Sequence, residues 1–164
     1  YNMPNVKAPR ISNKEDWKRK DWVDDMVNAI FNDELFRWFD SGDCYDLRLA
    51  KKIKQVIERT PTTKHWLPTR QHKFPKFTKV LTEIASLPNA VVRLSSDSIN
   101  GGIIEGDTTS TIWSTEPPEE AFECGAYTRN GECKDCRACW DKLVKVVAYP
   151  GHGAKMLKVI RLQG

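Results

Sequence analysis

Apolar and polar positions follow two different periods along the central part of the chain. In residues 45–59 and 73–86, apolar side chains recur every three or four positions, which is the spacing of amphipathic helices. Runs rich in aromatic and β-branched residues predict strands at 35–39, 64–67 and 90–94. Strands joined by helices in this way are parallel and have right-handed crossovers. The sequence therefore predicts an α/β fold with a parallel βαβαβ sheet, which is consistent with a partial βα barrel.

Weaker patterns precede and follow this central region. The tetrapeptide Ser12-Asn13-Lys14-Glu15 matches a capping box, in which the serine and glutamate side chains satisfy free backbone N–H groups. We expect one helix to follow it and to end near residues 32–33. Segments 111–114 and 144–149 predict two further strands. Because 164 residues is the size of one domain, we expect a single domain over residues 1–164.

Composition narrows the classes of protein to consider. No apolar run reaches the roughly 18–20 residues of a membrane span, so we expect no contact with a membrane. The net charge of +4 is small, and charge alone does not separate nucleic-acid binding from a solvated surface. Five cysteines is an odd count, and four of them fall between positions 124 and 139, unlike a secreted disulfide scaffold. We therefore expect a reduced, cytoplasmic protein.

The most specific motif is a cysteine run within residues 122–140, which we expect to form a metal-binding loop near the C-terminus. The ligands that it predicts are Cys124, Cys133, Cys136 and Cys139, spaced Cys-x8-Cys-x2-Cys-x2-Cys. Four thiolates match the ligand number of a structural zinc site and of an iron–sulfur cluster. The successive x2 intervals favour a 4Fe-4S cluster, because zinc sites more often use two separate C-x2-C pairs. Two alternatives stay open: that no metal is bound, and that His152 is a spare ligand rather than a loop residue.

Polar residues directly follow the predicted strands. In parallel α/β sheets, ligands bind beyond the carboxyl ends of the strands. The candidate ligand-binding residues are therefore Asp40, Ser41, Asp43, Arg70 and Ser95. Arg70 would hold an anion, and Asp40 would act as a general base or a metal ligand. The structural alternatives are that Asp43 caps the helix beginning near residue 45 and that Arg70 forms an ion pair with an aspartate. Cys44, outside the run, is expected to pack as a small hydrophobic residue.

Several of these segments together resemble the gene product 88 domain family of tailed phages and related bacterial elements. The similar stretches are Arg37 to Asp43, Trp66 to Arg70, Val92 to Ser95, Cys133-x2-Cys136-x2-Cys139-Trp140 and Tyr149-x2-His152. The resemblance implies phage origin and metal binding, but no particular reaction. Family members typically carry a further cysteine-rich segment upstream, with a C-x2-C pair, and this chain lacks those cysteines.

Two functions are compatible with these features. The first is a phage-type metal-binding accessory protein that binds a host protein or nucleic acid in the cytoplasm of an infected bacterium. The second is an enzyme of unknown reaction that acts on a phosphorylated or nucleotide-like substrate at the strand ends. The sequence contains no P-loop, no G-x-G-x-x-G and no HExxH helix, so no named reaction class is indicated. The first function is therefore the prediction that we carry forward.

Overall fold

The computed structural model describes residues 11–40 and 42–151. Ser41 and His152, which the sequence singled out, lie outside these residues. The helices are α2 (Trp22–Ile30), α3 (Leu47–Arg59) and α4 (Pro75–Ser86). The strands are β1 (Leu35–Arg37), β2 (Lys64–Thr69), β3 (Ala90–Ile99), β4 (Thr109–Trp113), β5 (Phe122–Glu123) and β6 (Val146–Pro150). Short 3-10 turns cover Gln71–Lys73, Gly125–Arg129 and Ala138–Trp140.

The six strands form one sheet in the order β1-β2-β3-β4-β6-β5, and every neighbouring pair is parallel. The sheet curls into a half-barrel. The predicted α/β class, the parallel βαβαβ arrangement and the partial barrel are therefore confirmed. Helices α3 and α4 are the two crossovers that join β1 to β2 and β2 to β3, as the alternating periods indicated.

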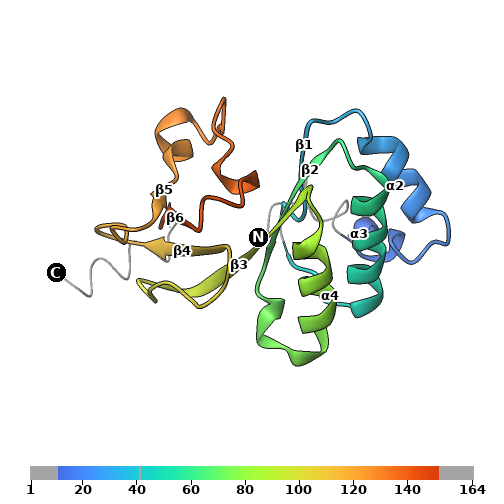
Figure 1. Cartoon of the computed structure of the whole chain (residues 1–164), viewed down its shortest axis with the longest axis horizontal. Helices are drawn as coiled ribbons and strands as arrows, with labels where there is room; N and C mark the ends of the chain where they lie inside the picture. Colours follow the sequence, from blue (N-terminus) through green and yellow to red (C-terminus); the bar gives the residue numbers. More distant parts are fainter. Residues whose placement is uncertain (1–10, 41, 152–164) are drawn as a thin grey trace.

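The main hydrophobic core lies between the helices and one face of strands β1–β3. Figure 1 shows α2, α3 and α4 grouped beside these strands, with the segment between β5 and β6 lying away from them. Ile53 and Ile57 of α3 and Phe77 of α4 are completely buried, and they pack in one cluster with Leu67 and Val92 of the sheet. Burying a side chain of this size stabilises a fold by about 1.5–3 kcal/mol. This core leaves the opposite face of the sheet for the cysteine segment.

Both central helices begin slightly later than predicted, and their first residues explain why. Helix α3 begins at Leu47, because the Asp46 carboxylate caps it by accepting from the backbone N–H of Arg48 at 2.8 Å. The alternative that Asp43 caps this helix is therefore wrong. Helix α4 begins at Pro75, a residue that suits the first turn because its missing N–H would be unpaired there anyway.

The expected single helix after the capping box is instead two helices. Residues 11–16 are already helical, so the helix does not begin at the predicted cap, and α2 follows only after a break. Lys52 of α3 donates to the carbonyl groups of Trp17 and Arg19 within the break. In a continuous helix these carbonyls would accept hydrogen bonds from backbone N–H groups of the same helix. The hydrogen bonds from Lys52, a residue distant in sequence, therefore compete with formation of one continuous helix. The Trp17 ring is thereby buried in the core.

The strand boundaries also differ in two informative places. Strand β3 continues to Ile99 with an irregular register between Ser95 and Ile99, so Ser95 lies inside the strand rather than after it. Strand β5 is a two-residue edge strand within the predicted cysteine loop, and the sequence pattern did not indicate it. Among the described helices, none is long and apolar enough to cross a membrane.

Candidate functional site

The concave face of the half-barrel borders a cavity of about 530 Å³. Side chains along a strand alternate between the two faces of a sheet, so residues two apart share a face. Cavity-lining strand residues show this spacing: Trp66 and Pro68 in β2, and Ser110 and Ile112 in β4. Ala90 and Val92 of β3 pack in the helix-side core, while Ser95, an odd number of positions away, lines the cavity. The cavity therefore lies opposite the helices.

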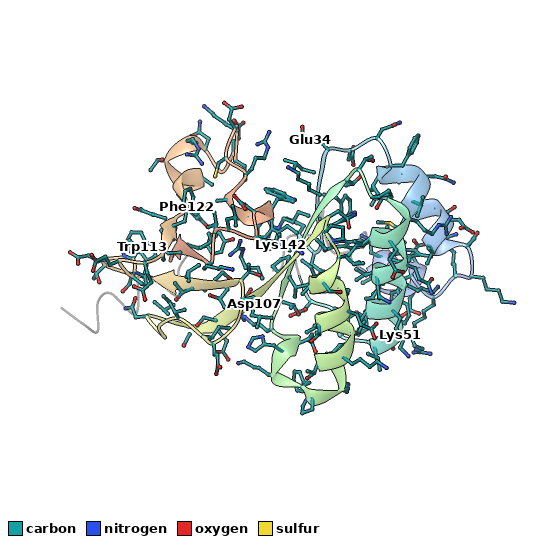
Figure 2. All side chains as sticks on the ribbon, in the orientation of Figure 1. Glu34, Lys51, Asp107, Trp113, Phe122 and Lys142 are labelled. Atoms are coloured by element: carbon teal, nitrogen blue, oxygen red, sulfur yellow. The ribbon has the colours of Figure 1, made fainter. Side chains whose placement is uncertain are left out.

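The cysteine segment covers this face and is attached at both of its ends. At the start, the backbone N–H of Cys124 donates to the carbonyl of Ala148 at 2.8 Å, which extends the β5–β6 pairing. At the other end, the indole N–H of Trp140 donates to the carbonyl of Phe36 at 3.1 Å. Figure 2 shows Phe122, where this segment begins, far from Lys51 on the helix side of the sheet.

Arg93 of β3 provides the strongest attachment. Its side chain is completely buried, and its two terminal nitrogens donate to five backbone carbonyls rather than to a carboxylate. The acceptors and distances are Thr109 at 3.0 Å, Val144 at 3.1 Å, Lys145 at 3.4 Å, Ala138 at 3.1 Å and Asp141 at 3.3 Å. Burial lowers the pKa of Arg93 from its ordinary value. One guanidinium thus fixes the chain between Ala138 and Lys145 to the sheet.

The middle of the segment is a series of tight turns. The backbone N–H of Cys136 donates to the carbonyl of Cys133 at 3.0 Å, which closes the first C-x2-C interval. Lys134 inside this turn has φ +47, and Asn130 and Gly131 before it have φ +56 and +83. Asparagine and glycine adopt this left-handed conformation more readily than other residues. The turns bring Cys133 back over the sheet.

Three of the four clustered cysteines meet at the cavity. Cys124, Cys133 and Cys139 line its wall, and Cys136 lies in the same turn as Cys133. The Cys139 sulfur is 3.2 Å from the hydroxyl of Tyr149. Burial raises the pKa of the Cys139 thiol to about 11, and the neighbouring Cys124 and Cys133 add to the effect while Tyr149 and Arg93 oppose it. A thiolate here would therefore need a nearby cation.

The donor set fits a thiolate-bound metal, but the coordination shell is not assembled. Within residues 11–40 and 42–151, no three His, Cys, Asp or Glu side chains are grouped closely enough to hold a metal ion. Thiolates are soft ligands that suit zinc and iron–sulfur clusters, and three of them already share one wall. Holding a metal would require the sulfur atoms to move closer together, including that of Cys136, which is half-buried and does not line the cavity.

The predicted strand-end residues separate into two groups. Arg70 and Ser95 line the cavity beside the cysteines. Asp40 and Asp43 instead line a second cavity of about 700 Å³ on the helix side, whose walls include Trp17, Trp22 and Trp38. Asp40 is exposed there. The sequence placed all of these residues on one face, and the structure does not bring Asp40 and Arg70 into the same cavity.

Asp43 connects the ends of two neighbouring strands. Its carboxylate accepts from the hydroxyl of Thr69 at 2.7 Å, from the backbone N–H of Arg70 at 2.7 Å and from the backbone N–H of Cys44 at 2.6 Å. Arg70 is therefore linked to this aspartate through its backbone and not through the predicted ion pair. Cys44 is 1% exposed and packs in the main core, which confirms that expectation, and burial raises its pKa to about 12.

Sequence reasoning missed Arg37, Trp66 and Arg93. All three were included only as parts of predicted strands and of the stretches that resemble the family. One signal in the sequence could have identified Arg93: it is an arginine in the middle of an apolar strand. A lone charged residue at such a position must be either exposed to solvent or fully hydrogen-bonded. The partners of Arg93 are backbone carbonyls, and sequence patterns do not identify carbonyl positions.

Comparison with known proteins identifies the family. The family described as gene product 88 matches residues 1–142, which is most of the chain. The chain therefore belongs to this family, as the resemblance indicated. The comparisons with curated proteins and with solved structures gave no significant match.

Proposed function

We propose that this gene product 88 family member is a phage-type metal-binding accessory protein that acts in the cytoplasm of an infected bacterium. The four clustered cysteines would hold one iron–sulfur cluster, favoured as 4Fe-4S, or one zinc ion. The observation that supports this proposal most directly is that Cys124, Cys133 and Cys139 line the same cavity wall, although fifteen positions separate the first from the last.

The bound group would cross-link a segment that has little regular structure of its own. Between β5 and β6 the described chain contains only two 3-10 turns, so few backbone hydrogen bonds hold it together. Metal–thiolate bonds stabilise such segments, because the ligands are brought together only in the folded state. Cys124 and Cys139 are fixed to the sheet by their neighbours, and Cys133 and Cys136 would complete the site from the turn.

A host protein or nucleic acid would bind the outer side of this segment. Leu143 is 85% exposed, and Phe122 at the start of the segment is 44% exposed. Cationic side chains stand close by in the sequence, at Arg129, Lys134 and Arg137. Exposed aromatic and cationic residues together suit protein partners and nucleic-acid partners, which is why both remain within this proposal.

The enzymatic alternative is less well supported by the site. It required Asp40 and Asp43 to act together with Arg70, and these carboxylates line the helix-side cavity. Arg70 and Ser95 do share the concave cavity, so binding of an anionic substrate by these two residues stays open.

Metal analysis tests the proposal directly. Protein purified without oxygen should contain about one zinc ion or one cluster per chain, and a cluster would give a brown protein with broad absorption near roughly 400 nm. Cys136→Ala should lose the metal and the protection of backbone amides in residues 122–140 against hydrogen exchange. Cys44→Ala is the matched control, because Cys44 packs in the main hydrophobic core and not in the cysteine segment. This variant should keep both the metal and the amide protection. Wild-type protein that is folded, fully protected in this segment and free of metal would refute the proposal.

A further inference from the structure

The concave cavity has an uncompensated positive charge. Arg37 at the end of β1 and Arg70 after β2 both line it, and the described residues of its lining include no aspartate or glutamate. Neither guanidinium forms an ion pair within the described residues, whereas nine ion pairs occur among other described side chains. Asp97 interacts electrostatically with Arg70, but the main partner of Asp97 is Lys73, and Asp43 contacts only the backbone N–H of Arg70. Two arginines therefore line a hollow in which no described lining residue is a carboxylate.

Trp66 lies in the same wall with an unused hydrogen-bond donor. Its side chain is 6% exposed, and its indole N–H is buried without an acceptor among the described residues. Buried tryptophan N–H groups normally have a partner. The described chain has five such orphan side-chain atoms, and Trp66 Nε1 is the one that belongs to a cavity-lining residue. The Arg37 guanidinium lies over the same ring at 4.7 Å, so charge and donor are adjacent.

The remaining walls combine a hydroxyl group with an apolar surface. The Ser110 hydroxyl donates to that of Ser95 at 3.2 Å, which leaves the Ser95 hydroxyl hydrogen available to another acceptor. Pro68, Ile99 and Ile112 supply an apolar wall against which a flat ring can lie. A volume of about 530 Å³ lies within the usual range for small-molecule sites, about 300–1,000 Å³.

We propose that this cavity binds a nucleoside monophosphate, with Arg37 and Arg70 contacting the phosphate and the apolar wall contacting the base. Guanidinium groups hold phosphate oxygens by paired, charge-assisted hydrogen bonds. The Ser95 hydroxyl donates to a further oxygen of the ligand, and the Trp66 ring lies against the Arg37 guanidinium. The site uses Arg37 and Trp66 and excludes Asp40 and Asp43, whose negative charge would repel a phosphate. Arg37 and Arg70 are not among the proposed metal ligands, although Cys124, Cys133 and Cys139 line the same cavity.

Calorimetric titration of the full chain tests this proposal. The ligands are the four ribonucleoside monophosphates, the matching nucleosides and inorganic phosphate. At least one monophosphate should bind about tenfold more tightly than its nucleoside or inorganic phosphate, because each lacks half of the contacts. Arg37→Gln and Arg70→Gln should each weaken that binding by about tenfold or more, since each removes charged hydrogen bonds.

The controls separate a built site from general attraction of anions. Arg48→Gln is matched to Arg37→Gln, because Arg48 also lies over a tryptophan, Trp17 at 5.5 Å, but lines neither cavity. It should bind the monophosphate as the wild type does. Ser95→Ala removes the donor hydroxyl, and it should weaken binding with thermal stability retained. The proposal is overturned if no monophosphate binds, if Arg48→Gln weakens binding equally, or if a short single-stranded oligonucleotide binds more tightly than every monophosphate.

Discussion

Replacing Arg93 by methionine should detach the end of the cysteine segment from the sheet. Methionine retains an unbranched apolar stem in a buried position but removes all five hydrogen bonds to backbone carbonyls. The carbonyl of Lys145 keeps a second donor, the backbone N–H of Thr109 at 2.8 Å. Those of Asp141 and Val144 have no other donor within the described residues. The substitution therefore leaves two carbonyls without their partner.

The expected loss of stability follows from those two groups. A buried acceptor left without a donor costs about 1–3 kcal/mol, and because these two carbonyls are only partly buried, both together cost about 2–3 kcal/mol. Burying a charged guanidinium costs desolvation energy, and the same cost lowers the pKa of Arg93. Removing the guanidinium recovers part of this cost. We therefore expect the free energy of unfolding to fall by about 2 kcal/mol. Arg93→Lys should lie between the two proteins, because one ammonium group cannot reach carbonyls on both sides of a planar guanidinium.

Urea unfolding followed by tryptophan fluorescence measures this loss, and hydrogen exchange locates it. In Arg93→Met, the backbone amides of residues 138–145 should lose protection against hydrogen exchange. The amides of α3 and α4 should lose only as much protection as the fall in the global free energy of unfolding accounts for. Arg59→Met is the matched control, since Arg59 is exposed and pairs with Asp24 at the surface, and it should change stability by less than about 0.5 kcal/mol. An Arg93→Met protein as stable as this control, with protected amides at 138–145, would refute the assignment of Arg93 as the attachment.

Two further predictions concern the helix-side core and the strand ends. Asp43→Ala should lower the free energy of unfolding, measured in urea, by about 2 kcal/mol, because it leaves the Thr69 hydroxyl and two backbone N–H groups unpaired. Asp40→Ala is the control and should not lower it. Equal losses in the two variants would contradict the role of Asp43 in connecting the strand ends. Burial lowers the pKa of His65 from 6.5 to about 4, so the unfolded chain binds the proton first as the pH falls. Stability should therefore be complete above pH 6.5 and decrease by at most about 3 kcal/mol towards pH 4, in denaturant titrations at several pH values. His65→Gln should remove that slope, and a wild-type slope in the variant would assign the pH dependence to other groups.

The tautomer of His65 shows why its protonation opposes folding. Its Nδ1 accepts from the indole N–H of Trp38 at 3.2 Å, so that nitrogen carries no hydrogen in the folded protein. The Thr60 hydroxyl donates to the carbonyl of Val56 and accepts from Nε2 at 2.9 Å. Protonation of Nδ1 would place a second donor against the Trp38 N–H inside the core. The folded state therefore binds the proton only at low pH.

Periodicity along the sequence determined the central architecture. The helical spacing of Ile53 and Ile57, and of Phe77 and Ile84, appears in the structure as two buried faces against the strands. Such faces are local properties of the chain, because side-chain spacing follows directly from helix geometry. The parallel order of β1, β2 and β3 then follows from the handedness of the crossovers. The boundaries were less accurate, since the caps Asp46 and Pro75 compete with several equally plausible neighbours.

The weaker predictions failed where a distant residue competes with local pattern. The capping box suggested one N-terminal helix, but Lys52 holds carbonyls of the break between two helices. Strand β5 forms only because β6 is already present beside it, and two residues have no strand pattern of their own. Ser95 was placed after a strand that in fact continues through it alongside β4.

The sequence by itself determined the sheet, the clustering of the four cysteines in one segment and the packing role of Cys44. The tertiary structure alone decided which of the polar residues meet. It placed Arg70, Ser95 and three cysteines around one cavity, and it placed Asp40 and Asp43 around another. The ends of adjacent parallel strands lie at the same edge of the sheet, but the side chains that follow them can lie on either face of the sheet. The curl of the sheet, the course of the loops and the carbonyl contacts of Arg93 make that choice, because they are set by contacts between residues far apart in the chain.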